Sequence, residues 1–309
     1  MSNLLVIFGV TGSQGASITN TIINDAELLK MYKIRGITRD PSKADAQALA
    51  KKGVEVVKAD LDDRASIQAA LNGAHTVFAM TVSMYVPGGM EREVEQGKAI
   101  ADEAVAAGAK LLIWSTVPSP TKLTNGNYPV DSFDSKDTVK DYIETLPIKS
   151  AFFSPGGFMT NFQTHMGAHP GPDGQLAVTN FIKPDTIIPL IDIAEDTGKY
   201  VGAILADPEK YAGTTFCSAT KIYTMQQIVD AMANASGKPI KYNQVPKDVY
   251  ASFLPEATKK TFVNMMSYFE YCGYYGPDSE KLVKWAADNA RGKPTTFEEF
   301  LQREGLPGL

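Results

Sequence analysis

Three glycines at a spacing of three follow the first apolar run of the chain. Gly9, Gly12 and Gly15 occur in the stretch IFGVTGSQGASI. Where a buried strand turns into a helix, the first glycine permits a tight turn, the second lets the backbone approach a pyrophosphate, and the third lets the helix pack close to the sheet. The amides at the start of the helix then point toward the phosphates. The spacing predicts a dinucleotide site, with a ligand-free turn as the alternative, formed by Gly9, Thr11, Gly12, Ser13, Gln14 and Gly15.

The second apolar run ends in GITRDPSK, where the adenosine ribose of a dinucleotide would lie. An acidic side chain at this place accepts hydrogen bonds from the ribose hydroxyls of NAD, whereas the 2'-phosphate of NADP requires a cation. Arg39, with Lys43 one helical turn further on, therefore favours NADP(H). Asp40 lies between them and keeps NAD(H) open as the alternative.

The third run ends in KADLDD, which would lie beside the adenine. Asp60 and Leu61 are placed to border an edge of the base, although Asp60 could equally be a solvated surface acid. Asp62 precedes a helical stretch, and we expect it to cap that helix.

Six short apolar runs, each suited to a strand buried on both faces of a parallel sheet, must hold these residues in place. They span 4–9, 33–38, 54–60, 75–81, 110–115 and 149–154. Helical patterns alternate with them at 13–25, 42–52, 64–72, 90–108 and 134–145. Such alternation predicts an α/β fold with a doubly wound parallel sheet of the Rossmann type.

The regular alternation fails after Ser154, where the chain becomes rich in turn-forming residues. Helical patterns continue at 192–206 and 224–236 with short strand-like pieces between them. We predict a Rossmann domain over 1–154 and a smaller α/β region for a substrate or partner over 155–309. Some strands and helices of this second region are expected to return to the Rossmann core.

Composition excludes several classes of function. The formal net charge is −5 over 309 residues, and no stretch concentrates lysine and arginine with aromatic residues as nucleic-acid-binding surfaces do, which disfavours direct binding of nucleic acid. No apolar run is long enough to span a membrane, and we expect no metal site in a chain with three histidines. Two distant cysteines without a secretory leader favour a cytoplasmic or nuclear protein without disulfides.

With these pieces assembled, the sequence resembles the NmrA-like family of atypical short-chain dehydrogenases/reductases. The resemblance covers nearly the whole chain and rests on GVTGSQGASI, ITRDPSK, KADLDD, VFAMT, LLIWSTV, FDSKDTVKDYI and SPGGFMTNF in the family's order. It implies a Rossmann domain with a small C-terminal region, and NADP(H) or NAD(H) as the dinucleotide. Members of the family range from redox-sensing regulators of transcription to true reductases.

The resemblance also implies roles for single residues. Arg39 and Lys43 would hold the 2'-phosphate, Thr81 would border the nicotinamide ribose, and Lys136 would point at the same ribose. Phe158 and Asn161, on a helix after SPGG, would flank the nicotinamide.

Typical short-chain reductases carry a tyrosine four residues before the lysine, whose phenol protonates the developing alkoxide. Here that position is Ser132, and neither Tyr128 nor Tyr142 has the required spacing from Lys136. We therefore favour a nucleotide-dependent redox sensor or regulator that acts through a protein partner. The alternative is an NADPH-dependent reductase of a quinone, an enone or a phenylpropanoid-type molecule, in which Lys136 is the catalytic residue.

Three further residues could contact such an aromatic small molecule. Tyr85 lies in TVSMYVPGGMERE, a loop that could move as a lid, and Ser115 and Thr116 end the fifth run, where they could also be ordinary strand-end hydroxyls. The aromatic stretch 262–275 could line an apolar pocket or a partner surface. We expect it to complete the core.

Overall fold

The computed structural model describes residues 2–171 and 174–307, and it contains a seven-stranded parallel sheet in the order β11-β6-β5-β4-β1-β2-β3. The predicted doubly wound Rossmann fold is confirmed. The chain reverses its direction of travel across the sheet between β1 and β4, which creates the crevice where ligands bind in such folds. The strands are β1 (Asn3–Phe8), β2 (Tyr32–Thr38), β3 (Glu55–Lys58), β4 (Thr76–Ala79), β5 (Leu111–Ser115), β6 (Lys149–Pro155) and β11 (Thr215–Ser218).

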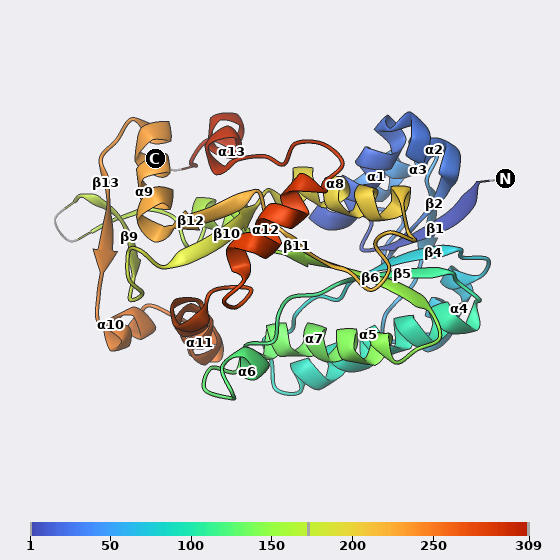
Figure 1. Cartoon of the computed structure of the whole chain (residues 1–309), viewed down its shortest axis with the longest axis horizontal. Coiled ribbons are helices and arrows are strands. Elements are labelled where there is room, and N and C mark those ends of the chain that lie inside the picture. Colours follow the sequence, from blue (N-terminus) through green and yellow to red (C-terminus); the bar gives the residue numbers. More distant parts are fainter. Residues whose placement is uncertain (1, 172–173, 308–309) are drawn as a thin grey trace.

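Helices cover both faces of this sheet (Figure 1). On one face α1 packs against α8, and on the other α5 packs against α4 and α7. The strands are apolar on both faces because each face meets a helical layer. The helices are α1 (Ser13–Asn24), α2 (Ala26–Met31), α3 (Ala44–Lys51), α4 (Arg64–Leu71), α5 (Gly89–Ala106), α6 (Pro120–Leu123), α7 (Asp131–Glu144) and α8 (Ile193–Ala206).

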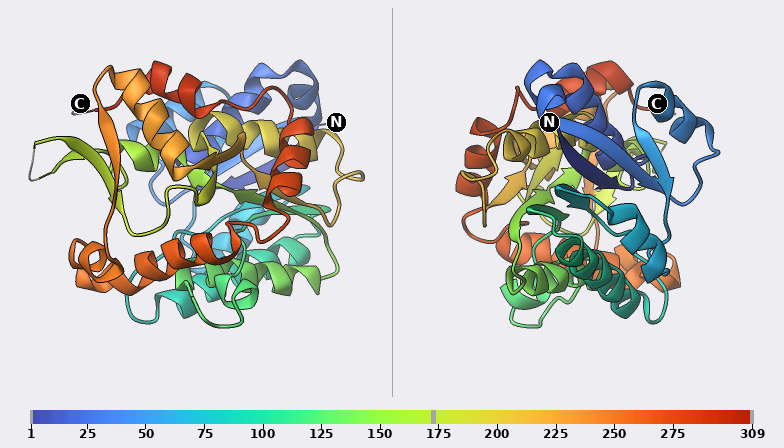
Figure 2. Two further views of the ribbon diagram at one scale, coloured as in Figure 1. Left: turned by 60° about the vertical axis from the view of Figure 1, so that its left-hand side comes forward. Right: turned by 90° about the vertical axis from the view of Figure 1, so that its right-hand side faces the viewer.

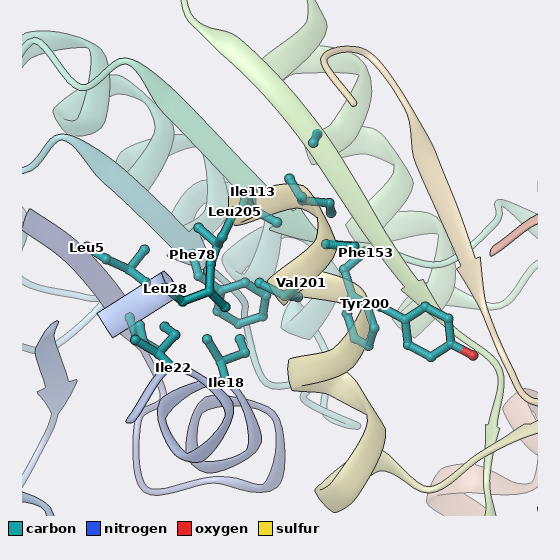
Figure 3. Packing of buried hydrophobic residues seen from close by; sticks show 14 of the residues in the cluster. Leu5, Ile18, Ile22, Leu28, Phe78, Ile113, Phe153, Tyr200, Val201 and Leu205 are labelled. Atoms are coloured by element: carbon teal, nitrogen blue, oxygen red, sulfur yellow. The ribbon is translucent and has the colours of Figure 1, made fainter. Parts of the chain in front are cut away.

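Contact between α1 and α8 is unusually close, as the packing around Ile18 and Val201 in Figure 3 illustrates. The amide of Gly198 on α8 donates to the Ser17 hydroxyl of α1 at 2.9 Å. A side chain at Gly198 would bring its Cβ to 2.0 Å from Thr21 Oγ1. Helix α1, which begins at the glycine turn, is thus held in place by α8 from the C-terminal half of the chain.

Two small sheets and several helices form the remaining part, at the opposite end from the amino-terminal strand (Figures 1 and 2). From this half of the chain, β11 forms an edge strand of the large sheet beside β6, and α12 (Ser279–Asp288) packs against β11. One small sheet contains β12 (Lys221–Thr224), β10 (Ile187–Ile191) and β7 (Gly157–Phe158), and the other contains β13 (Ile240–Gln244), β9 (Leu176–Asn180) and β8 (His169–Pro170). The helices are α9 (Met225–Ser236), α10 (Lys247–Ser252), α11 (Glu256–Cys272) and α13 (Phe297–Glu304).

The aromatic stretch belongs mainly to the core of this second part, as expected. Its buried members are Met266, Tyr268, Phe269, Tyr274 and Tyr275. Tyr274 and Tyr275 donate hydrogen bonds to the carbonyl oxygens of Pro155 and Ser154, at 2.9 and 2.7 Å. These bonds tie the stretch to the end of β6.

Some local expectations were wrong. The predictions missed the short helices α2 and α6, and they did not identify α10 to α13 near the carboxyl terminus. The cap of α4 is Asp63, whose carboxylate accepts from the amides of Ala65 and Ser66, and not Asp62. Within the described residues, no helix combines the length and the apolar character needed to cross a membrane.

Candidate functional site

The glycine turn joins β1 to α1 at the carboxyl edge of the sheet. Gly9 has a φ of +67°, in the left-handed region that side chains disfavour. The amide of Gly12 closes the turn on the Gly9 carbonyl oxygen at 2.9 Å. A Cβ on Gly15 would lie 2.4 Å from that same oxygen, so the helix can approach the strand only because Gly15 has no side chain. The turn therefore has the geometry that the glycine spacing predicts.

Polar groups in this turn are left free for a ligand. Gly12 is the N-cap of α1 and supplies no side-chain cap, so the first amides of the helix remain available. Gln14 Oε1 is buried and has no hydrogen-bond partner within residues 2–171 and 174–307. A buried acceptor without a partner costs free energy unless a ligand or water satisfies it. The cradle and this acceptor fit a dinucleotide.

A cleft of about 590 Å³ opens from the turn along the carboxyl ends of β1 to β4. Most of the residues predicted to bind a cofactor line it: Gly9, Thr11, Gly12, Ser13, Gln14, Arg39, Lys43, Asp60, Leu61 and Phe158. The predictions did not include other lining residues, among them Met80, Val82, Met84, Arg92, Gln96 and Ile193. The cleft thus brings the ends of strands far apart in sequence to one place.

Two basic side chains lie at the end of the cleft near β2. Arg39 and Lys43 are both exposed, and their side chains form no ion pair with any carboxylate in the described part of the chain. Asp40 is held by its own turn, because its carboxylate accepts from the Ser42 hydroxyl and from the Ser42 amide. The Ser42 hydroxyl, which donates to the carboxylate, lowers the pKa of Asp40. This arrangement presents net positive charge to a ligand.

The wall beside Asp60 and Leu61 is closed by contacts between a loop and α5. Arg92 Nε donates to Asp62 Oδ1 at 3.0 Å, and Gln96 donates to the same oxygen at 2.8 Å. Hydrogen bonding from Arg92 lowers the pKa of Asp62 to about 2. Asp62 is therefore a partner of α5 and not the cap of α4.

Lys136, on α7, has its ammonium group fixed beside the loop that follows β4. It donates to Ser83 Oγ at 3.0 Å and forms an ion pair with Glu93, which is 1% exposed at its side chain. Burial lowers the pKa of Lys136, and the Glu93 carboxylate opposes this effect. The Lys136 carbonyl accepts from Trp114 Nε1 at 3.0 Å, which anchors this turn of α7 to β5. Sequence reasoning missed Glu93.

Several other residues predicted for the site do not line the cleft. The hydroxyl of Thr81 donates to Glu93 Oε1 at 2.8 Å, and Thr81 is not among the residues that line the cleft. Ser115 and Thr116 are buried at the end of β5, also away from the lining. The expected helix after SPGG is a 3-10 helix over Met159–Gln163; it contains Asn161, and Phe158 precedes it in β7.

Aromatic side chains lie near the same loop. Tyr85 is 45% exposed and stacks on Phe262 of α11, with ring centroids 6.2 Å apart. Phe262 also lies 5.8 Å from the ring of His165. Tyr142, by contrast, donates to Asp102 of α5 at 2.6 Å. In the described residues, no group of His, Cys, Asp and Glu side chains could hold a metal ion.

Curated relatives match the chain over most of its length. A protein of Dictyostelium discoideum described as NmrA-like family domain-containing is 28% identical over 98% of both chains. An NmrA-like family domain-containing oxidoreductase of Aspergillus campestris, cpsB, is 28% identical over 82% of this chain and 79% of its own.

Solved structures share the fold. NmrA, a negative transcriptional regulator crystallised with NADP, superposes with a TM-score of 0.82 at 24% identity, covering 99% of this chain and 96% of its own. An NADPH-dependent quinone oxidoreductase of Escherichia coli gives a TM-score of 0.71 at 19% identity, over 97% and 98% of the two chains. The family model described as NmrA-like matches residues 1–301. The chain therefore belongs to the NmrA-like family.

Proposed function

We propose that this chain binds NADP(H) in the cleft, with NAD(H) as the weaker ligand. The observation that carries the proposal is the pair of unpaired cations, Arg39 and Lys43, at the end of a cleft that begins at the glycine turn. The amides of the turn would hold the pyrophosphate, and the two cations would hold the 2'-phosphate. The crystal structures of NmrA with NADP and with NAD support the binding of a dinucleotide.

The bound dinucleotide would serve as a redox signal. Ser132 stands where a typical reductase has its tyrosine, and the Lys136 ammonium is already paired with Glu93. A sensor needs only different affinities for the nucleotide in two conformations, and a tenfold difference is about 1.4 kcal/mol. The output would be a contact with a regulatory protein partner in the cytoplasm or nucleus, as expected for control of transcription.

A second candidate is an NADPH-dependent reductase of a quinone, an enone or a phenylpropanoid-type molecule. Several curated relatives are named oxidoreductases, which supports this candidate. The nicotinamide would supply the redox chemistry, and Lys136 would supply a proton from beside the loop that carries Tyr85. The stacked rings of Tyr85 and Phe262 would suit an aromatic substrate.

Two measurements test these proposals. Calorimetry with NADP and with NAD should show tighter binding of NADP, and equal affinities would refute the proposed preference. A panel of quinones, enones and ethers with NADPH then separates the two candidates. Turnover at ordinary enzymatic rates that is lost in Lys136→Ala would establish the reductase and rule out a purely sensing role.

A further inference from the structure

A fully buried carboxylate lies beneath the loop that follows β4. Glu93, on α5, accepts from Thr81 Oγ1 at 2.8 Å and from Ser135 Oγ at 2.9 Å, and it pairs with the Lys136 ammonium. Removing a carboxylate from water is costly unless it is paired and hydrogen-bonded. Here three donors from two segments of the chain satisfy it: Thr81 after β4, and Ser135 and Lys136 on α7. Neither the proposed binding of the phosphates nor the fold of α5 requires an acid at this position.

The position of Lys136 connects this carboxylate to the cleft. The ammonium donates to the hydroxyl of Ser83, and the residues on either side, Val82 and Met84, both line the cleft. An ammonium has three donors, and Ser83 and Glu93 account for two of them. The Lys136 side chain is 16% exposed and adjoins the cleft through Ser83, although neither residue is among those that line the cleft.

We propose that Glu93 is a positioning residue that holds the Lys136 ammonium charged and aimed at the nicotinamide half of the dinucleotide. The inference rests on the proposed binding of NADP(H). Typical short-chain reductases fix the lysine near a tyrosine on the same helix; here a carboxylate on the neighbouring helix α5 does so. Among the described residues, Glu93 is the charged group that faces the Lys136 ammonium, and the Ser83 hydroxyl is its other hydrogen-bond partner.

The test compares NADP with adenosine 2',5'-bisphosphate, which lacks the nicotinamide half. By calorimetry, Glu93→Gln should weaken NADP binding roughly tenfold or more and leave the affinity for the bisphosphate unchanged, because an interaction with a charged group is lost only at the nicotinamide end. As the pH rises, the affinity of this variant for NADP should also begin to fall at a lower pH than the affinity of the wild type. Burial lowers the pKa of Lys136 and the Glu93 carboxylate opposes this effect, so the amine loses its charge at a lower pH when the carboxylate is absent.

Glu103→Gln is the matched control, since Glu103 lies on the same helix, is buried and pairs with Arg64 away from the cleft. It should change neither affinity. The double variant Glu93→Gln/Lys136→Met leaves no unpaired buried charge and guards against loss of the fold. It should bind NADP as weakly as Lys136→Met alone, without the pH dependence, because Glu93 acts through Lys136.

Three outcomes would overturn the inference. They are an unchanged affinity of Glu93→Gln for NADP, an equal loss for NADP and the bisphosphate, or a double variant that is clearly weaker than Lys136→Met. If the wild-type protein bound neither ligand, the proposed function itself would fail, and that result is distinct from the other three.

Discussion

Gly15 approaches Gly9 so closely that a methyl group on Gly15 would lie 2.4 Å from the Gly9 carbonyl oxygen. Gly15→Ala must push α1 away from β1, which should cost about 1–3 kcal/mol of stability and abolish binding of the dinucleotide. Thermal unfolding and calorimetry would measure the two effects. Gly202→Ala is the control, because its Cβ would meet Thr21 at an ordinary 3.4 Å. Normal binding by Gly15→Ala would contradict this account of the turn.

The preference for NADP over NAD should depend on Arg39. A hydrogen bond to a charged group contributes about 1.5–3 kcal/mol, so Arg39→Ala should weaken NADP binding about 10- to 100-fold and leave NAD nearly unaffected. Lys43→Ala should act in the same direction with a smaller effect. Lys33→Ala removes an exposed lysine of β2 outside the cleft and should change neither affinity. An unaltered ratio of the two affinities in Arg39→Ala would refute the assignment.

Much of the fold and of the phosphate end of the site follows from the sequence. Continuous apolar runs bounded by turn residues are typical of strands that are buried on both faces, and the six expected runs correspond to β1 to β6. The glycine turn could be predicted because its geometry depends on residues close together in the chain. The cap of α4 was misplaced by one residue, since Asp62 and Asp63 are adjacent and only the path of the backbone decides between them.

The nicotinamide end was harder to predict because contacts between distant segments form it. Glu93 lies in a stretch with many charged residues, and such a stretch is typical of the solvent-exposed face of a helix. In the folded chain it is buried between α7 and the residues that follow β4, which contact it through Ser135, Lys136 and Thr81. One signal was present in the sequence: Glu93 falls on the same helical stripe as the buried residues Gly97, Ile100, Ala101 and Ala104. An acidic side chain on the buried stripe of a helix needs a cation or hydrogen-bond donors beside it, so its position predicts such a partner.

The contact between Asp62 and Arg92 should support the adenine side of the cleft. Arg92→Ala would release the loop that carries Asp60 and Leu61, and we expect NADP and NAD to bind several-fold more weakly by similar factors, because they share the adenine. Arg64→Ala removes a comparably exposed arginine, which pairs with Asp102 and Glu103 of α5 away from the cleft, and it should leave both affinities unchanged. A selective loss of NADP alone would instead place Arg92 at the 2'-phosphate.

The ion pair that links the amino-terminal helices to the carboxyl-terminal segment should make the stability of the fold depend on pH in the acid range. Asp25 caps α2 and pairs with Arg291, and hydrogen bonding from Arg291 lowers the pKa of Asp25 from 3.8 to about 2. A carboxylate with a lowered pKa in the folded state adds stability above the pKa of the unfolded chain and loses it as the pH falls through the folded value. Asp25→Asn keeps a cap but removes the charge, and it should cost about 0.5–1 kcal/mol at pH 7.

Urea unfolding of the wild type and of Asp25→Asn between pH 7 and pH 3 measures this contribution. The difference in the free energy of unfolding should be constant down to about pH 5 and should fall to roughly half near pH 3, as the unfolded wild-type chain takes up its proton first. Glu209→Gln removes the carboxylate of a pair with Lys149 whose glutamate is 83% exposed, and it should give almost no difference at any pH. A difference for Asp25→Asn that stayed the same at pH 3 would show that the amide disturbs packing, and that the charge pair with Arg291 does not stabilise the fold.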